Sequence, residues 1–121
     1  MILGLRTAIY PVSDLTEAKA WYSRVLECNP YFDEPFYVGY TVGGFELGLI
    51  PEGIPGAQGV QAYWGVPDAA QELARLVGLG ASVHEPVHDV GESIKVAGVK
   101  DPFGNVFWII ENPYFKVKDV R

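Results

Sequence analysis

The sequence predicts an α+β fold in which the order strand–helix–strand–strand–strand occurs twice. The main observation is an internal repeat, since Asp14 and Asp68, 54 positions apart (68 − 14), each follow a short apolar stretch ending in Val-x-Asp. A helical pattern follows each aspartate, and short aromatic and β-branched runs follow each helical pattern. Together these features predict one domain over 1–121, with module one at about 1–50, a Pro- and Gly-rich connector at 51–59, and module two at about 60–121.

Both predicted helices begin with the same capping device. Asp14 is followed by Glu17 at the third helical position, and Asp68 by Gln71, which is the spacing of a capping box. The first helix carries an apolar stripe and ends before Pro30, because proline disfavours helix in the residue before it. Its stripe is Leu15, Ala18, Tyr22, Val25 and Leu26, and that of the second helix is Ala69, Leu73, Leu76 and Val77. Gly78 and Gly80 are expected to end the second helix.

The rest of each module is predicted as strands. The predicted strands are 6–12, 31–33, 36–42 and 45–50 in module one, and 61–66, 82–87, 93–100 and 105–110 in module two. Gly43-Gly44 predicts a two-residue hairpin, and Asp101-Pro102-Phe103-Gly104 has the residue preferences of a type I turn.

Composition and charge restrict the classes of partner. Nine Lys+Arg against 15 Asp+Glu give a formal net charge of −6, the opposite of the balance that phosphate binding requires, so we expect no nucleic-acid partner. Cys28 is the only cysteine, which excludes an intrachain disulfide. The apolar segments are short and interrupted, so we expect no membrane partner and a cytoplasmic protein.

These residues resemble the vicinal oxygen chelate superfamily, the glyoxalase / bleomycin-resistance / dioxygenase fold. The resemblance rests on Val12-Ser13-Asp14-Leu15 before a helix containing Trp21-Tyr22, and on Asp101-Pro102-Phe103-Gly104-Asn105 before a final apolar strand ending in Glu111. It implies two tandem βαβββ modules that form a curled mixed sheet around a ligand cavity, commonly within a homodimer. Since such a fold hosts unrelated chemistries, function must be argued from the site.

The resemblance also implies four metal-ligand positions, one in the first and one in the last strand of each module. Aligned on the Val-x-Asp segments, they fall at Thr7 and Gln61, near Glu46, and at Trp108. Only Glu46 is a strong ligand type, and an indole cannot ligate at all. A one-residue slip of a strand would instead bring in Arg6, Ala8 or Glu111, without adding a histidine. We therefore expect no metal and no cofactor, because stable divalent sites need three or more donors.

The two histidines do not alter this expectation. His84 and His88 would share a face on an uninterrupted strand, but Pro86 between them indicates an edge strand or a loop. We interpret both as solvated or singly hydrogen-bonded side chains. Glu46 is the one candidate catalytic residue, as a general base, although a carboxylate in this position is equally compatible with a structural role.

The predicted cavity is aromatic and apolar with a few polar groups, as small-molecule pockets are. Its candidate ligand-binding residues are Thr7, Ile9, Glu46, Gln61, Tyr63 and Trp108, and strand alternation adds Gly48 and Ile110. The strand at 36–42 contributes either Tyr37, Gly39 and Thr41 or Phe36, Val38 and Tyr40, which the sequence leaves open.

Three hypotheses follow. The first is a metal-independent protein of the bleomycin-resistance kind that binds a hydrophobic or cationic small molecule in a homodimer, with Glu46 facing the guest. The second is a glyoxalase-like lyase, isomerase or dioxygenase with a reduced metal site at Glu46 and Gln61. The third is a closed barrel filled by its own aromatic side chains, which binds no guest.

Overall fold

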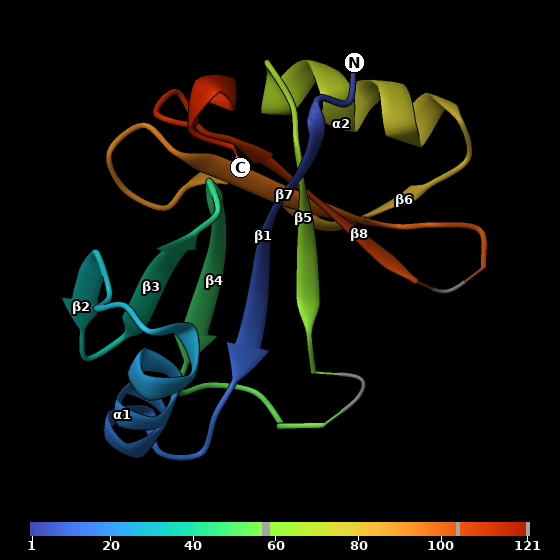
Figure 1. Cartoon of the computed structure of the whole chain (residues 1–121). Coiled ribbons are helices and arrows are strands. Elements are labelled where there is room, and N and C mark those ends of the chain that lie inside the picture. The colour runs from blue at the N-terminus through green and yellow to red at the C-terminus, as the bar shows by residue number, and fades with distance from the viewer. Residues whose placement is uncertain (57–58, 104, 121) are drawn as a thin grey trace. The chain divides into compact units, whose positions relative to one another are not determined.

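A computed structural model describes residues 1–56, 59–103 and 105–120 of the chain. Ala57 and Gln58 of the predicted connector, Gly104 of the predicted turn and Arg121 lie outside the described residues. Two α-helices and eight strands, in the order β-α-β-β-β followed by β-α-β-β-β, confirm the α+β class and the tandem modules (Figure 1). None of the described helices is long and apolar enough to cross a membrane.

The chain forms two compact units, which differ slightly from the predicted modules. The N-terminal module comprises Thr7–Gln61 and Lys116–Arg121, and the C-terminal module comprises Met1–Arg6 and Ala62–Phe115. The elements of the first half are β1 (Gly4–Pro11), α1 (Leu15–Leu26), β2 (Phe32–Glu34), β3 (Tyr37–Val42) and β4 (Phe45–Ile50). Those of the second half are β5 (Gln61–Gly65), α2 (Ala69–Gly78), β6 (Ser82–Asp89), β7 (Lys95–Lys100), β8 (Val106–Glu111) and the 3₁₀ turn η1 (Val117–Asp119).

Both modules use one strand order. In the N-terminal module the order is β2-β3-β4-β1, and in the C-terminal module it is β6-β7-β8-β5. In each module, neighbouring strands among the three later ones pair antiparallel, and the first strand pairs in parallel with the last. This pairing follows from the helix between the first two strands of each module, which carries the chain back to the starting end.

The helix starts confirm the predicted capping. The Asp14 side chain accepts a hydrogen bond from the Glu17 N–H, and Asp68 accepts one from the Gln71 N–H, both at 3.0 Å. α1 ends at Glu27, which is left-handed with φ 57°, and α2 ends at Gly78. The caps thus satisfy N–H groups that a helix start leaves without intrahelical partners.

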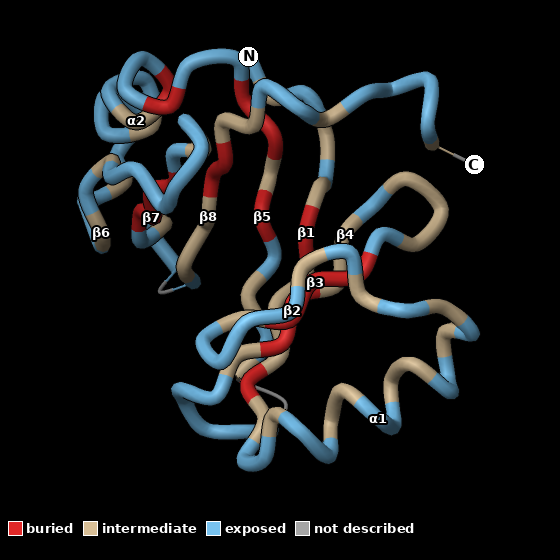
Figure 2. The backbone as a smooth tube through the Cα atoms, turned by 90° about the vertical axis from the view of Figure 1, so that its left-hand side faces the viewer, coloured by how far each residue is buried: buried red, intermediate tan, exposed pale blue. Residues whose placement is uncertain are grey.

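Each helix packs on one face of its own module's strands. In the N-terminal module the buried side chains of Val38, Tyr40 and Leu49 lie against α1 residues such as Leu15 and Tyr22. In the C-terminal module the buried core is Val66, Ala69, Ala97 and Ile109, with Leu73 and Leu76 of α2 packed against it. The other face of each module is therefore free to carry functional side chains, and the burial pattern along the strands is visible in Figure 2.

Three strand boundaries differ from the sequence prediction by two residues: the start of β1, which is at Gly4, the end of β6 and the start of β7. The other boundaries agree to within one residue. β6 continues through Pro86 to Asp89 as the outer strand of its module's order, with register shifts on both sides of Glu85. β7 begins at Lys95 rather than at Ser93, because Glu92 and Ser93 adopt left-handed backbone with φ 55° and 65°. Proline is tolerated within a strand at a sheet edge or at a bulge, so Pro86 does not interrupt β6.

Candidate functional site

Cross-strand register identifies which residues of the N-terminal module face away from α1. Thr7 and Thr41 both pair with Glu46, and Gly39 and Ile9 both pair with Gly48. Since directly paired residues project to the same side of a sheet, these side chains share one face, together with Tyr37. This decides the alternative that the sequence left open, in favour of Tyr37, Gly39 and Thr41. We refer to the surface formed by Thr7, Ile9, Tyr37, Gly39, Thr41, Glu46 and Gly48 as the Glu46 face.

The Glu46 carboxylate is held by two hydroxyl groups. The Thr7 hydroxyl donates to Oε1 at 3.1 Å, and the Tyr31 hydroxyl donates to Oε2. Thr7 is buried, with 5% of its surface exposed, whereas Glu46 is half-buried and Tyr31 is 61% exposed. One donor on each oxygen fixes the orientation of the carboxylate, and hydrogen bonds to an ionised acceptor are among the stronger ones.

Two glycines allow the aromatic side chain of Tyr37 to lie flat on this face. A Cβ at Gly48 would be 2.1 Å from the Tyr37 hydroxyl oxygen, and a Cβ at Gly39 would be 3.1 Å from Tyr37 Cε2 and 2.9 Å from Glu46 Oε2. Tyr37 contacts Phe32 edge-on, with ring centroids 6.0 Å apart, and Phe32 contacts Phe36 at 5.9 Å. The carboxylate therefore lies beside a group of aromatic rings, part of which is exposed to solvent.

The corresponding face of the C-terminal module is built around Trp108. Its ring lies 5.5 Å from that of Tyr63 and is met edge-on by His84 at 5.6 Å. A Cβ at Gly98 would be 2.8 Å from Trp108 Cε3, so this glycine makes room for the indole. Tyr63, Trp108 and Gly98 pair directly across β5, β8 and β7 and thus share one side, which we refer to as the Trp108 face.

Burial makes the Tyr63 hydroxyl a weaker acid than that of an ordinary tyrosine. Desolvation, together with the nearby charge of Glu85, raises the pKa of Tyr63 to about 12. The phenol therefore stays neutral throughout the physiological range. On the Trp108 face it contributes a hydrogen-bonding hydroxyl and an apolar ring, and no negative charge.

The predicted site residues separate into two groups. Thr7, Ile9 and Glu46 lie together on the Glu46 face, where Thr7 and Glu46 are in direct contact. Tyr63 and Trp108 are in contact on the Trp108 face. Gln61 is the half-buried first residue of β5.

Sequence reasoning missed two contributors. Tyr31, which donates to Glu46, precedes β2, and His84, which contacts Trp108, lies on the outer strand β6. The run of aromatic residues between positions 31 and 37 was the only available sign of the first. His88, exposed and within 3.0 Å of the Pro86 carbonyl oxygen, agrees with its interpretation as a singly hydrogen-bonded side chain.

The donors at the four implied ligand positions do not suit a divalent metal. The Thr7 hydroxyl is a neutral donor to Glu46, and the Trp108 indole has no lone pair to give. Glu111, the alternative ligand in β8, accepts a hydrogen bond from the Ala69 N–H at 2.8 Å and so caps α2. The described residues contain no cluster of three His, Cys, Asp or Glu side chains suited to a metal ion.

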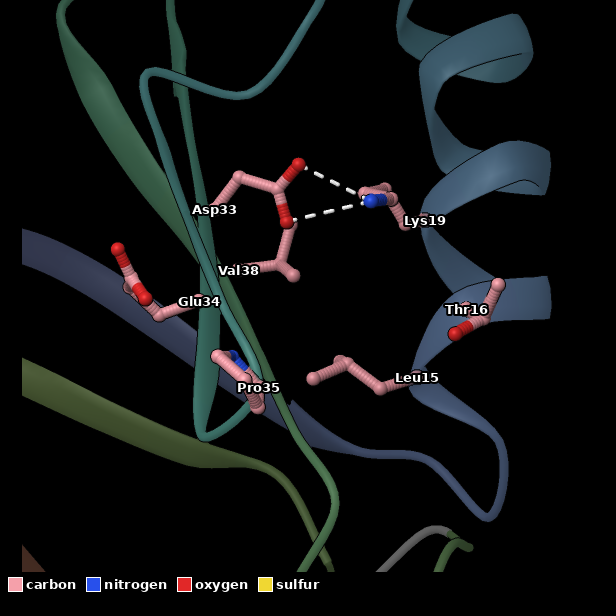
Figure 3. A pocket seen from close by; sticks show the side chains of 7 residues that line it. All are labelled: Leu15, Thr16, Lys19, Asp33, Glu34, Pro35 and Val38. Carbon is pink, nitrogen blue, oxygen red and sulfur yellow. Dashed lines mark hydrogen bonds and ion pairs between the residues drawn. The ribbon is translucent and has the colours of Figure 1, made fainter.

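A separate pocket lies on the helix side of the N-terminal module (Figure 3). It has a volume of about 330 Å³ and lies where α1 meets β2 and the start of β3. Its lining residues are Leu15, Thr16, Lys19, Asp33, Glu34, Pro35 and Val38. Lys19 and Asp33 form an ion pair at 3.0 Å, so the one cation among these lining residues is already paired with an acid. The Glu46 face, on the opposite side of β3, remains the better candidate site.

Comparison with known proteins is consistent with this architecture. The profile of a family described as a glyoxalase-like domain matches residues 7–110. No curated protein matches the chain with comparable significance.

Several solved structures share the fold. One is a methylmalonyl-CoA epimerase variant from Streptomyces coelicolor in complex with 2-nitronate-propionyl-CoA, at a TM-score of 0.77 and 12% identity over 93% of this chain and 99% of that one. A methylmalonyl-CoA epimerase from Mycobacterium tuberculosis has a TM-score of 0.70 and 19% identity over 91% and 88%. A glyoxalase/bleomycin resistance protein/dioxygenase superfamily member from Vibrio splendidus has a TM-score of 0.67 and 22% identity over 88% and 97%. At these identities the likeness shows the fold alone.

Proposed function

The chain belongs to the glyoxalase-like domain family, and we propose that it binds a cationic, planar small molecule at the Glu46 face without a metal. The observation that carries this proposal is the half-buried carboxylate of Glu46, held by the Thr7 and Tyr31 hydroxyls beside the ring of Tyr37. An oriented negative charge next to aromatic faces is the arrangement that recognises organic cations.

The energetics favour a charged guest over a neutral one. Partial burial lowers the effective dielectric around Glu46, so a cation placed near it gains more than it would at an exposed carboxylate. The exposed rings of Tyr31 and Phe36 supply surface for a planar guest and an additional cation–π attraction. The net charge of −6 raises the local concentration of cations and thereby the association rate.

The other predicted properties belong to the same proposal. Thr7 positions the carboxylate, and Ile9, Gln61, Tyr63 and Trp108 are proposed as further ligand-binding residues. A homodimer in the cytoplasm is proposed as the working state of the protein.

A glyoxalase-like lyase, isomerase or dioxygenase is the alternative. Glu46 would be its general base, and a reduced metal site at Glu46 and Gln61 would activate the substrate. The donor chemistry described above disfavours this site. Elemental analysis of protein purified without chelators checks the alternative, because a bound metal near one equivalent of Zn, Ni, Fe or Mn would support it.

The proposal is tested with a pair of probes that differ in charge. N-methylquinolinium is a planar cation, and quinoline at pH 7.5 is its neutral counterpart. We expect calorimetry to show tighter binding of the cation, and Glu46→Gln to weaken the cation about tenfold while leaving quinoline unchanged, since about 1.4 kcal/mol corresponds to a factor of ten.

Glu52→Gln is the matched control, because it removes the same negative charge as Glu46→Gln but from an exposed position in the connector. Circular dichroism confirms that each variant is folded. Equal affinity for the two probes in the wild-type protein, or equal loss of affinity in the two variants, would exclude Glu46 as the recognising group.

A further inference from the structure

Arg6 occupies an unusual position in the C-terminal module. Its guanidinium carbon lies 3.7 Å from the centroid of the Phe115 ring, a cation–π contact. The rest of the side chain lies along Gly65, where a Cβ would be 2.7 Å from Nε and 3.0 Å from Cζ. Gly4 is also close, since a Cβ there would be 3.3 Å from one terminal nitrogen. The guanidinium is thus held in place by one aromatic ring and by two residues that lack side chains.

This cation has no acidic partner in the part of the chain that the structure describes. The ion pairs found there are Met1 with Glu72, Lys19 with Asp33, and Arg75 with Glu72. The one hydrogen bond that Arg6 donates goes to the Leu5 carbonyl at 3.4 Å, which is long. Desolvation lowers the pKa of Arg6, but a guanidinium stays protonated at neutral pH. A half-buried, immobilised cation whose terminal N–H groups are weakly used is suited to an anion.

The surroundings of Arg6 define the kind of anion. Gly65, on which the side chain lies, is two residues beyond Tyr63 on β5 and therefore projects to the same face. Two residues along a strand span about 6.6 Å. The Arg6 side chain, which lies against Gly65, is therefore about that far along β5 from the Tyr63–Trp108 pair. An aromatic surface, formed by Tyr63 and Trp108, and a cation, Arg6, thus lie side by side within one module.

We propose that the Trp108 face binds a planar aromatic carboxylate, with the ring against Trp108 and the carboxylate paired to the Arg6 guanidinium. A carboxylate matches the fork of two parallel guanidinium N–H donors, which a single-point cation such as lysine cannot reproduce. Tyr63 and Trp108 are also among the residues proposed for the cationic guest, but Arg6 takes no part in that proposal. Substitution of Arg6 therefore tests this inference separately from substitution of Glu46.

The probe for this site is 2-naphthoate, compared with the neutral 2-naphthamide. We expect ¹H–¹⁵N spectra to show 2-naphthoate shifting the Arg6 Nε–H and the Trp108 indole N–H, and calorimetry to show that it binds more tightly than the amide. Arg6→Gln should weaken 2-naphthoate at least about tenfold, and Arg6→Lys should recover only part of the loss.

A second variant separates the placement of Arg6 from its charge. Gly65→Ala keeps the guanidinium but puts a methyl group 2.7 Å from the present position of Nε, which displaces the side chain, so it should also weaken 2-naphthoate. Gly78→Ala is its matched control, because nothing lies within 4 Å of a Cβ at that position. Arg24→Gln on α1 controls for the loss of one surface cation.

The outcomes distinguish the two sites. Glu46→Gln should leave 2-naphthoate binding unchanged, and Arg6→Gln should leave N-methylquinolinium binding unchanged. Equal affinity of the wild-type protein for 2-naphthoate and 2-naphthamide, or wild-type affinity in a folded Arg6→Gln variant, would overturn the inference and leave Arg6 as a packing residue against Phe115.

Discussion

The two modules have the same strand order but differ in how side chains fill the face of the strands opposite the helix. In the N-terminal module the row of paired residues Ile9, Gly48 and Gly39 has no aromatic side chain, and the ring of Tyr37 covers it. In the C-terminal module the corresponding row is Tyr63, Trp108 and Gly98, and Trp108 itself supplies the ring. The two modules therefore share the pairing of these strands, but the aromatic ring on this face comes from Tyr37 of β3 in one and from Trp108 of β8 in the other.

The comparison also explains why Glu46 has no acidic counterpart. Ile9 and Tyr63 are 54 positions apart, as the two capping aspartates are, and they pair with Gly48 and Trp108. Trp108 therefore corresponds to Gly48 and not, as the aligned ligand positions predicted, to Glu46, whose equivalent in β8 is Val106. The carboxylate thus belongs to one module only. The two modules therefore carry opposite charges beside their aromatic rings: the carboxylate of Glu46 in the N-terminal module and the guanidinium of Arg6 in the C-terminal module.

The largest effect is expected from filling Gly98, one of the two glycines on which the rings lie. Gly98→Ala places a methyl group 2.8 Å from Trp108 Cε3, and because the indole is also packed against Tyr63, we expect a loss of about 2 kcal/mol in unfolding free energy. Gly48→Ala should cost less, about 1 kcal/mol, since the atom it meets is the hydroxyl end of Tyr37. Urea denaturation measures both.

Near-UV circular dichroism gives the signature that separates these variants. Gly98→Ala should alter the tryptophan bands, and Gly48→Ala should leave them unchanged. Gly78→Ala, at the end of α2 with open space around its Cβ, is the control and should be neutral or stabilising. Unaltered tryptophan bands in the Gly98 variant would mean that the two faces are not filled as described.

Most of the fold was predictable from local sequence signals. Asp14 and Asp68 identified both helix starts, because capping is a local interaction that the spacing of residues discloses. Gly43 and Gly44, with φ 60° and 90°, form the predicted hairpin between β3 and β4. The start of β7 was not predictable, since the left-handed conformation of Ser93 is uncommon for a residue with a side chain.

The site was predictable only in part. The family resemblance placed Thr7 and Glu46 on the cavity face, and the structure shows a hydrogen bond between their side chains. Strand alternation cannot reveal the contact of Tyr31 with Glu46, because Tyr31 precedes β2 and its position depends on the course of the loop between α1 and β2. Arg6 was considered only as the product of a register slip, and its placement over Gly65 depends on a contact between distant segments of sequence.

The modules also differ in the interactions that hold their helices, and α2 is held by the ion pairs of Glu72. Glu72 is 3% exposed and pairs with the Met1 amino group at 2.5 Å and with Arg75 at 2.6 Å. Its hydrogen bond with the amino group, assisted by Arg75, lowers the pKa of Glu72 below its usual value of 4.5. A lowered pKa in the folded state contributes stability that is present above the unfolded-state value and is lost as the pH falls through the folded-state value.

We therefore expect Glu72→Gln to lower the unfolding free energy by about 1–1.5 kcal/mol at pH 7, and by less at a pH below the lowered pKa. Thermal denaturation between pH 3 and 7 measures the difference. Glu52→Gln, which removes an exposed charge from the connector, is the control. A difference between wild-type protein and Glu72→Gln that stays constant with pH would show that packing, and not ionisation, accounts for the effect.

The smallest effect concerns α1, which has no fully buried residue of its own and is held instead through Tyr40 of β3. The Tyr40 side chain is 0% exposed, and its hydroxyl lies 2.9 Å from both the Ser23 Oγ and the Lys19 carbonyl oxygen. Tyr40→Phe removes these hydrogen bonds without creating a large cavity, so we expect a loss of about 1 kcal/mol in unfolding free energy. Hydrogen exchange should accelerate in α1 and remain unchanged in α2. Equal acceleration in both helices would mean that the two are not fastened independently.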